Sequence, residues 1–201
     1  MMKRPLSVFV FALTCLLLVS STSPGKKGKV KKVLDGDTIV LEDGERIRYL
    51  CIDSPEEGEP FHDEAKRVND SLVFGKTVRV EFDRKVKDRY GRYLGYIWLD
   101  TLLVNDFLLR RGLVSVYYFK PNDRYLARFV TSAKSARTKK MGVWSLPHSD
   151  LDYYVGNKNS YRVHRPDCPQ ARDIKPKNRV EFETLFDAAD AGFAFCRTCK
   201  P

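Results

Sequence analysis

Short stretches in which apolar and polar residues alternate predict β-strands over much of the chain. Two Asp-Gly pairs, Asp35-Gly36 and Asp43-Gly44, lie between the first three stretches and are typical of tight turns. We therefore expect these three stretches to form a meander. The predicted strands cover residues 30–34, 38–41, 46–52, 77–82, 92–99 and 113–119.

Apolar residues at helical spacing predict three helices. The first covers residues 60–74 and ends at Gly75, and the second covers residues 102–111. Asn122 is expected to cap a third helix that runs to about residue 140. Five short strands with a helix between the third and the fourth predict a small Greek-key barrel of the OB type. A polar, proline-containing linker at residues 147–152 separates it from a second module.

The first 23 residues have the features of a secretory signal peptide. Lys3 and Arg4 precede an apolar run over residues 6–19, and small residues follow at 20–23. The run is short for a membrane-spanning helix, so we expect cleavage and a secreted or extracytoplasmic protein. Retention at the membrane through an uncleaved signal is the alternative.

Composition and charge narrow the class of partner. Hydrophobic residues make up 43% and charged residues 31% of the chain, as in a globular protein. The formal net charge of +10 favours a polyanion, such as nucleic acid, an anionic membrane surface or a cell-wall polymer. A basic surface that only keeps the protein soluble is the alternative.

Three cysteines and one histidine near the C-terminus form two close pairs, His164-x3-Cys168 and Cys196-x2-Cys199. Four nitrogen and sulfur ligands in this arrangement are typical of a tetrahedral structural Zn²⁺ site. A disulfide is the alternative, but it would leave an odd cysteine and would not explain His164. Cys51 lies in an apolar strand and is expected to be a buried thiol. The predicted fold class is therefore β-rich α+β, with a five-stranded OB-fold barrel and about three helices at residues 29–146, plus a small zinc-binding α/β module at 153–201.

Two carboxylates in the barrel are candidate ligands for a hard cation. Asp37 follows a glycine turn at the start of a strand, and Asp53 ends the next long strand. Antiparallel neighbours can bring both to one point, where the Ser54 carbonyl would add a third oxygen. An open oxygen site of low charge suits Ca²⁺ better than Zn²⁺. A backbone cap is the alternative role of an aspartate in a turn, and we prefer it for Asp35 and Asp43.

Three motifs in this order resemble the staphylococcal nuclease (thermonuclease) family. They are Asp35-Gly-Asp37-Thr, Arg48-x4-Asp53-Ser-Pro-Glu56 and Asp88-Arg-Tyr-Gly-Arg92, and the likeness covers about residues 29–145. The family implies an OB-fold barrel that cleaves DNA and RNA with Ca²⁺, breaks the 5′ P–O bond and leaves 3′-phosphates. The resemblance assigns Asp37, Asp53 and the Ser54 carbonyl to calcium.

The same resemblance assigns the catalytic residues. Glu56 matches the acid that positions or deprotonates the attacking water, and Arg48 and Arg92 match the two arginines that hold the phosphate. Two guanidiniums aimed at a phosphoryl group stabilise the charge that develops during attack. A cross-strand pair for Arg48 and a hairpin charge for Arg92 are the alternatives.

Substrate contacts are expected from aromatic and basic side chains. Tyr117 matches a family tyrosine that contacts the nucleotide, and Arg89 and Lys120 add positive charge nearby. Phe119 stands where the family has a second tyrosine, so one hydroxyl contact is missing. Barrel packing is the alternative role of Tyr118 and Phe119.

The C-terminal module resembles the zinc-binding module of Ada-type DNA methylphosphotriester repair proteins. The likeness rests on the Tyr153-Tyr-Val-Gly, His164-Arg-Pro-x-Cys168-Pro and Cys196-x-x-Cys-Lys-Pro201 segments. In that family the first ligand is a cysteine that accepts the methyl group, whereas here it is His164. Imidazole cannot replace that thiolate, so a structural or nucleic-acid-holding role is expected instead of repair.

The sequence thus predicts a secreted, calcium-dependent nuclease that acts on single-stranded or frayed DNA and RNA. No protein partner is implied, and a monomer is expected. A non-catalytic nucleic-acid-binding module on the same fold is the alternative, although binding alone does not need the whole set of acids and arginines. A zinc-dependent repair or regulatory protein is disfavoured by the signal segment and by His164.

Overall fold

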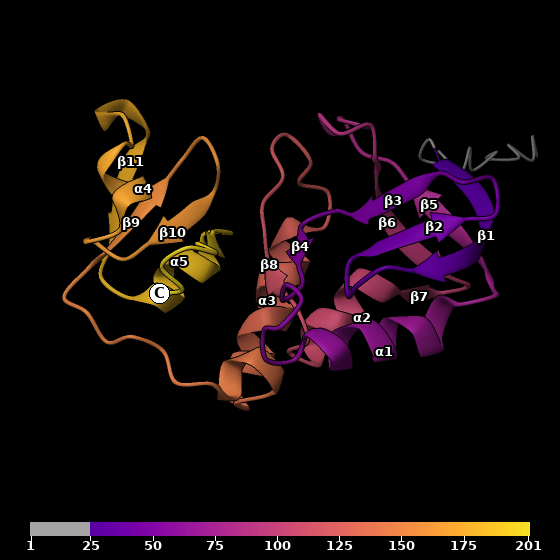
Figure 1. The fold of residues 1–201 in the computed structure, drawn as a ribbon, viewed down its shortest axis with the longest axis horizontal. Coiled ribbons are helices and arrows are strands. Elements are labelled where there is room, and N and C mark those ends of the chain that lie inside the picture. The colour runs from indigo at the N-terminus through magenta and orange to yellow at the C-terminus, as the bar shows by residue number, and fades with distance from the viewer. Residues whose placement is uncertain (1–24) are drawn as a thin grey trace, which may run out of the picture.

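A five-stranded barrel forms the centre of the structure, a computed structural model that describes residues 25–201 (Figure 1). Its strands are β1 (Gly25–Val33), β2 (Thr38–Leu41), β3 (Arg46–Tyr49), β5 (Thr77–Glu81) and β6 (Tyr93–Leu99). The antiparallel meander β1-β2-β3 is confirmed, and β5 and β6 extend the sheet from β1. Parallel pairing of β3 with β6 closes the sheet, so the predicted OB-type barrel is confirmed. The predicted signal segment lies outside the described residues.

The barrel interior is apolar because alternate residues of each strand point inward. Ile39, Ile47, Val80 and Leu94 come from four different strands, and each is 0% exposed. The packed interior holds the strand ends in fixed positions, and the candidate site lies at such ends.

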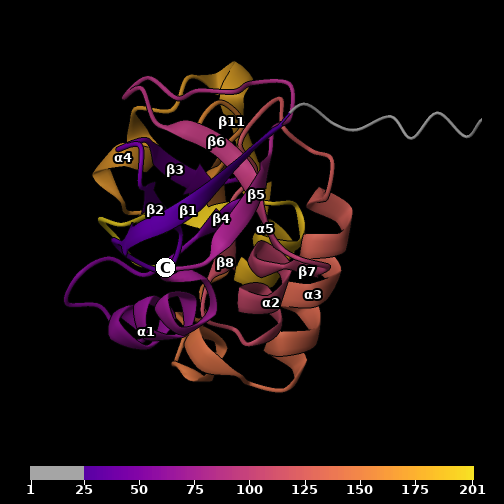
Figure 2. The same ribbon diagram turned by 90° about the vertical axis from the view of Figure 1, so that its right-hand side faces the viewer.

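Three helices pack below and beside the sheet, as Figure 2 shows. They are α1 (His62–Val73), α2 (Val104–Arg110) and α3 (Leu126–Thr138), followed by a 3₁₀ turn η1 (Gly142–Ser145). Each lies inside its predicted range. The fully buried Asn105 of α2 accepts the Ile97 N–H (2.9 Å) and donates to the Leu50 carbonyl (2.9 Å), which ties the helix to two barrel segments.

Two predicted strands are wrong in extent. The stretch 46–52 is broken at Cys51, whose φ of 60° turns the chain, so a separate strand β4 (Ile52–Asp53) leaves the barrel. It pairs with β8 (Ser115–Val116), the only part of stretch 113–119 that forms a strand among the described residues. A short strand β7 (Leu102–Leu103) pairs with the end of β6.

The predicted helix cap at Asn122 is also wrong. Its side chain accepts the Lys85 N–H (2.7 Å) and donates to the Lys85 carbonyl (2.9 Å), so it is committed to the charged hairpin. The residue that precedes α3 is Tyr125, which makes no side-chain cap. Cys51 is buried, as expected, and burial raises the pKa of its thiol to about 11.

The C-terminal module contains a second sheet, with strand order β11-β9-β10-β12. Its elements are β9 (Tyr154–Asn157), β10 (Arg162–His164), α4 (Pro169–Arg172), η2 (Pro176–Asn178), β11 (Arg179–Phe182), α5 (Leu185–Asp190) and β12 (Ala194–Phe195). Thr184 and Asp187 form a reciprocal capping box at the start of α5. An extended connection joins this module to η1 (Figure 1). Within residues 25–201, no helix has the length and apolar character needed to span a membrane.

Candidate active site

Asp37 stands at the entrance of β2, directly after the Asp35-Gly36 turn. The Asp35 carboxylate accepts the Asp37 N–H at 2.8 Å, which fixes the turn. Asp37 is only 5% exposed, and its Oδ2 accepts the Ser54 N–H at 2.6 Å. The Asp37 carboxylate is thus held between the entrance of β2 and the chain that follows β4.

Arg48, in β3, joins the two candidate metal ligands. Its Nε lies 3.1 Å from Asp37 Oδ1, and its Nη2 lies 2.9 Å from Asp53 Oδ1. The guanidinium is buried with both carboxylates and also donates to the Tyr49 carbonyl at 2.7 Å. One planar fork can serve both acids only if they meet at one point. The predicted convergence of Asp37 and Asp53 is therefore present in the structure.

The two buried aspartates differ in their electrostatic surroundings. Burial raises the pKa of Asp37 to about 7, because Arg48 opposes the loss of solvent only in part. Burial acts in the same direction on Asp53, but three guanidiniums outweigh it and lower the pKa of this carboxyl. They belong to Arg162, Arg48 and Arg197. Asp53 is therefore ionised at neutral pH, whereas the positive charge near Asp37 only partly offsets the burial of its carboxylate.

Glu56 lies two residues beyond Ser54, in the loop that leads from β4 to α1. Its side chain is 49% exposed, and its backbone N–H donates to Glu59 Oε2 at 2.8 Å. Arg197 Nη2 lies 2.5 Å from Glu56 Oε1 and 3.1 Å from Asp53 Oδ1. The predicted acid is therefore linked to the aspartate pair through this arginine.

Arg92 precedes the strand that pairs with the strand of Arg48, and it holds a different partner. It immediately precedes β6, whose Leu94 is the register partner of Arg48. Its Nε contacts Asp88 Oδ2 at 2.7 Å, and Asp88 Oδ1 accepts the N–H groups of Tyr90 and Arg92 at 2.9 and 3.0 Å. Asp88 thus organises the hairpin from which Arg92 projects, and phosphate binding by Arg92 would replace this ion pair.

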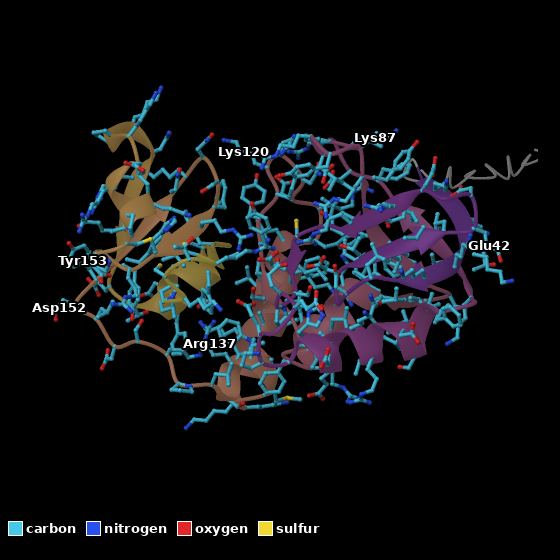
Figure 3. All side chains as sticks on the ribbon, in the orientation of Figure 1. Glu42, Lys87, Lys120, Arg137, Asp152 and Tyr153 are labelled. Carbon is cyan, nitrogen blue, oxygen red and sulfur yellow. The ribbon has the colours of Figure 1, made fainter. Side chains whose placement is uncertain are left out.

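The predicted substrate residues occupy two separate loops. Arg89 donates to the Tyr90 hydroxyl at the exposed hairpin. Tyr117 follows β8, and the Arg162 guanidinium carbon lies 4.3 Å from the centre of its ring. Lys120 is exposed, and Figure 3 shows it between the barrel and the C-terminal module. Tyr117 therefore borders the carboxylate cluster through Arg162, whereas Arg89 belongs to the hairpin of Arg92. The predicted strand over 113–119 ends at Val116 and lies outside the barrel sheet, so Tyr117 and Lys120 lie on the loop that follows it.

The four predicted zinc ligands converge in the C-terminal module. One ligand atom from each of His164, Cys168, Cys196 and Cys199 lies within 4.8 Å of the others. All four cysteines of residues 25–201 are free thiols, so the alternative disulfide is not formed. The Arg165 N–H donates to Cys199 Sγ at 3.3 Å, and the Thr198 N–H donates to Cys196 Sγ at 3.4 Å. Such donors stabilise thiolates, the form that binds metal.

Two site residues were missed by sequence reasoning. Arg162 Nη1 lies 2.7 Å from Asp53 Oδ2, and Arg197 contacts Asp53 and Glu56. Both belong to the C-terminal module, 109 and 144 residues from Asp53. They lack a motif of their own, and only the docking of the module onto the barrel identifies them.

Comparison with known proteins assigns the barrel to a family. The sequence profile described as "Staphylococcal nuclease homologue" matches residues 46–146. The chain belongs to the staphylococcal nuclease family. "Thermonuclease" of Staphylococcus intermedius is 31% identical over 166 residues, covering 72% of this chain and 99% of that protein. "Thermonuclease" of Staphylococcus hyicus is 35% identical over 126 residues, covering 58% of this chain and 75% of that protein. "Endonuclease YncB" of Bacillus subtilis (strain 168) is 34% identical over 125 residues, covering 57% of this chain and 59% of that protein.

The staphylococcal nuclease match covers part of the candidate site. Arg48, Asp53, Glu56 and Arg92 lie inside the matched residues, and Asp37 precedes them. The profile match ends at residue 146, so the C-terminal module with Arg162 and the metal-ligating cluster lies beyond it.

Proposed function

We propose that this protein is an exported, calcium-dependent nuclease that cleaves single-stranded or frayed DNA and RNA and leaves 3′-phosphates. Its class as a nuclease, an enzyme that hydrolyses phosphodiester bonds, follows from membership of the staphylococcal nuclease family. The observation that carries the proposal is the shared contact of Arg48 with Asp37 and Asp53. The apolar run behind Lys3 and Arg4 supports export.

The donor set fits a hard divalent cation. Asp37 and Asp53 offer carboxylate oxygens at one point, and the Ser54 carbonyl lies on the adjoining chain. The pKa of Asp37, raised by burial to about 7, indicates a carboxylate that lacks a full positive partner. We assign Asp37, Asp53 and Ser54 to calcium. When bound there, Ca²⁺ would supply Lewis-acid polarisation of the phosphoryl oxygen.

The protein groups supply the remaining chemistry. Glu56 orients a water molecule and accepts its proton as the water oxygen bonds to phosphorus. The bond from phosphorus to the 5′ oxygen breaks, that oxygen takes up a proton, and the phosphate stays on the 3′ oxygen. Arg48 and Arg92 donate to the phosphoryl oxygens, whose negative charge grows in the five-coordinate transition state.

The substrate is held beside this centre. Tyr117 offers an aromatic face for a nucleotide, and Lys120 and Arg89 offer positive charge for flanking phosphates. Stacking on the Tyr117 ring requires an unpaired base, which favours single strands over intact duplex. The protein acts as a monomer in this proposal, since one chain contains every group assigned.

The C-terminal cluster fits a structural zinc ion. Zn–S bonds of about 2.3 Å in a tetrahedron place the sulfur atoms about 3.8 Å apart, and the four ligand atoms lie within 4.8 Å of one another. Three of the four residues are buried, which suits a closed structural site better than a catalytic one. We also propose that the module is related to the Ada-type zinc-binding module, with His164 in place of the methyl-accepting cysteine.

Nuclease assays with separated metals test the proposal. The chain without residues 1–23 is stripped of metal, and Ca²⁺ and Zn²⁺ are added back separately with single-stranded DNA or RNA. We expect Ca²⁺ to restore cleavage with 3′-phosphate ends, and Zn²⁺ to bind without restoring it. Asp37→Asn, which keeps the size of the side chain, should abolish the response to Ca²⁺. Nucleic-acid binding without cleavage under any metal would support the non-catalytic alternative.

A further inference from the structure

Two arginines of the C-terminal module reach into the candidate nuclease site. Arg162 is the first residue of β10, and Arg197 lies between the zinc-ligand candidates Cys196 and Cys199. Arg162 Nη1 contacts Asp53 Oδ2 at 2.7 Å, and Arg197 Nη2 contacts Asp53 Oδ1 at 3.1 Å. The site is therefore covered by residues that the staphylococcal nuclease match does not include.

These contacts occupy most of the hydrogen-bond acceptor positions of the Asp53 carboxylate. A carboxylate offers about four lone-pair positions, and guanidiniums of Arg48, Arg162 and Arg197 already use both oxygens. Three neighbouring positive charges also repel a divalent cation. In this arrangement Asp53 is a poor calcium ligand. Arg197 additionally holds Glu56, the candidate general base, at 2.5 Å.

Arg162 covers a substrate surface as well as a metal ligand. Its guanidinium carbon lies 4.3 Å from the centre of the Tyr117 ring, where a nucleotide is proposed to stack. Its Nη1 also donates to the Phe195 carbonyl at 2.9 Å, which holds it to its own module, and its side chain is 16% exposed. A base cannot stack on this face of Tyr117 while Arg162 remains there.

Aromatic packing joins the module to the barrel domain. The ring centres of Trp144 and Phe195 lie 5.8 Å apart, and those of Tyr118 and Tyr161 lie 4.5 Å apart.

Ion pairs add to this packing. Lys200 pairs with Glu59 at 3.0 Å, and Arg137 of α3 pairs with Asp190 at 2.8 Å. Figure 3 shows Arg137 at the boundary between the two parts, and Figure 1 shows the extended connection that joins them. Because apolar packing as well as ion pairs holds the module on the barrel, opening of the site requires displacement of the Arg162 and Arg197 side chains rather than departure of the module.

We propose that the C-terminal module is an autoinhibitory lid of the nuclease site. It closes the site by presenting Arg162 and Arg197 to Asp53 and Glu56, and calcium and substrate must displace these guanidiniums. Zinc held by His164, Cys168, Cys196 and Cys199 would fix the loop that carries Arg197. The inference rests on the proposed calcium-dependent nuclease function.

Calcium binding to the zinc-loaded chain tests the lid directly. The variant Arg162→Gln/Arg197→Gln keeps hydrogen-bonding side chains but removes both charges from Asp53. We expect calorimetry to show calcium affinity at least about tenfold higher than in the wild-type chain, since two repelling charges are gone. Turnover at saturating calcium should equal or exceed the wild-type value.

The matched control is Arg165→Gln/Arg172→Gln, which removes the same charge from the same module. Arg165 pairs with Asp167 on the module surface, and Arg172 is exposed at the end of α4. This control should bind calcium as the wild type does. Because Arg197 is half exposed, the single variant Arg197→Gln is a second test that disturbs folding least. We expect it to raise the calcium affinity about threefold.

The outcomes separate the lid from the nuclease proposal. Unchanged calcium affinity in both Arg197 variants would overturn the lid, even if the wild-type chain cleaves nucleic acid with calcium. Unchanged affinity with lower turnover would overturn it in favour of arginines that contact substrate. A wild-type chain and variants that neither bind calcium nor cleave would overturn the nuclease proposal and the lid with it.

Discussion

Replacing Arg48 by glutamine tests the centre of the proposed site. The substitution removes the fork that joins Asp37 and Asp53 and leaves a shorter, uncharged side chain that can still form hydrogen bonds. Loss of one preorganised donor to a developing oxyanion typically costs about 2.7–4 kcal/mol, or about a hundred- to a thousandfold in turnover. We therefore expect turnover on single-stranded DNA to fall at least about a hundredfold, measured at saturating calcium.

The same substitution has a predictable effect on stability. Removing one partner of a buried ion pair typically destabilises a protein by about 3–5 kcal/mol. Here Asp37 keeps the Ser54 N–H at 2.6 Å, and Asp53 keeps two guanidiniums from the C-terminal module. We therefore expect the lower end of this range, about 3 kcal/mol, for the zinc-loaded, calcium-free chain in urea unfolding at pH 7.

Two controls make the Arg48 experiment decisive. Arg46→Gln removes an exposed arginine from the same strand, and it should change neither turnover nor stability. Arg48→Lys keeps the charge but not the planar fork, so it should resemble Arg48→Gln in turnover. A folded Arg48→Gln chain with turnover within about threefold of the wild type would refute the transition-state role, because that role requires a far larger loss.

Three further predictions concern the fold and the module. Asn105→Ala should lower the free energy of unfolding by about 2–4 kcal/mol in urea denaturation, because it leaves the buried Ile97 N–H and Leu50 carbonyl unpaired. A loss below about 0.5 kcal/mol would contradict this. Cys51 should not react with a thiol reagent at pH 8 in the folded chain, since burial raises its pKa to about 11; labelling as fast as in urea would contradict this. Cys168→Ser should lower the zinc content, measured by metal analysis, whereas Cys51→Ser should leave it unchanged.

The barrel was predictable because local signals agree with the global fold. The period-two patterns and the Asp35-Gly36 and Asp43-Gly44 turns indicate the meander, and glycines after the first two helices mark their ends. The structure differs from the prediction where tertiary contacts determine the local conformation. Cys51 adopts a positive φ that its residue type does not announce. Asn122 has the chemistry of a helix cap, but it binds the backbone of a hairpin 37 residues away.

The candidate site was predictable where its residues belong to one motif. Asp37, Arg48 and Asp53 meet because β2 and β3 are adjacent, and the short connection to β4 returns the chain to the same point. Arg162 and Arg197 were not predictable in the same way. Arginine is common in this basic chain, and the sequence does not indicate which of its arginines cross from the module to the barrel.

The lid connects two metal sites of different chemistry. The barrel offers hard carboxylate oxygens, and the module offers thiolates and an imidazole, so the two sites select different ions. Arg197 lies between two zinc-ligand candidates and contacts a calcium-ligand candidate, Asp53. Calcium ligation by Asp53 requires a lone pair that a guanidinium now holds. In this proposal zinc therefore acts against calcium, because it fixes the loop whose arginine must leave before the nuclease site can assemble.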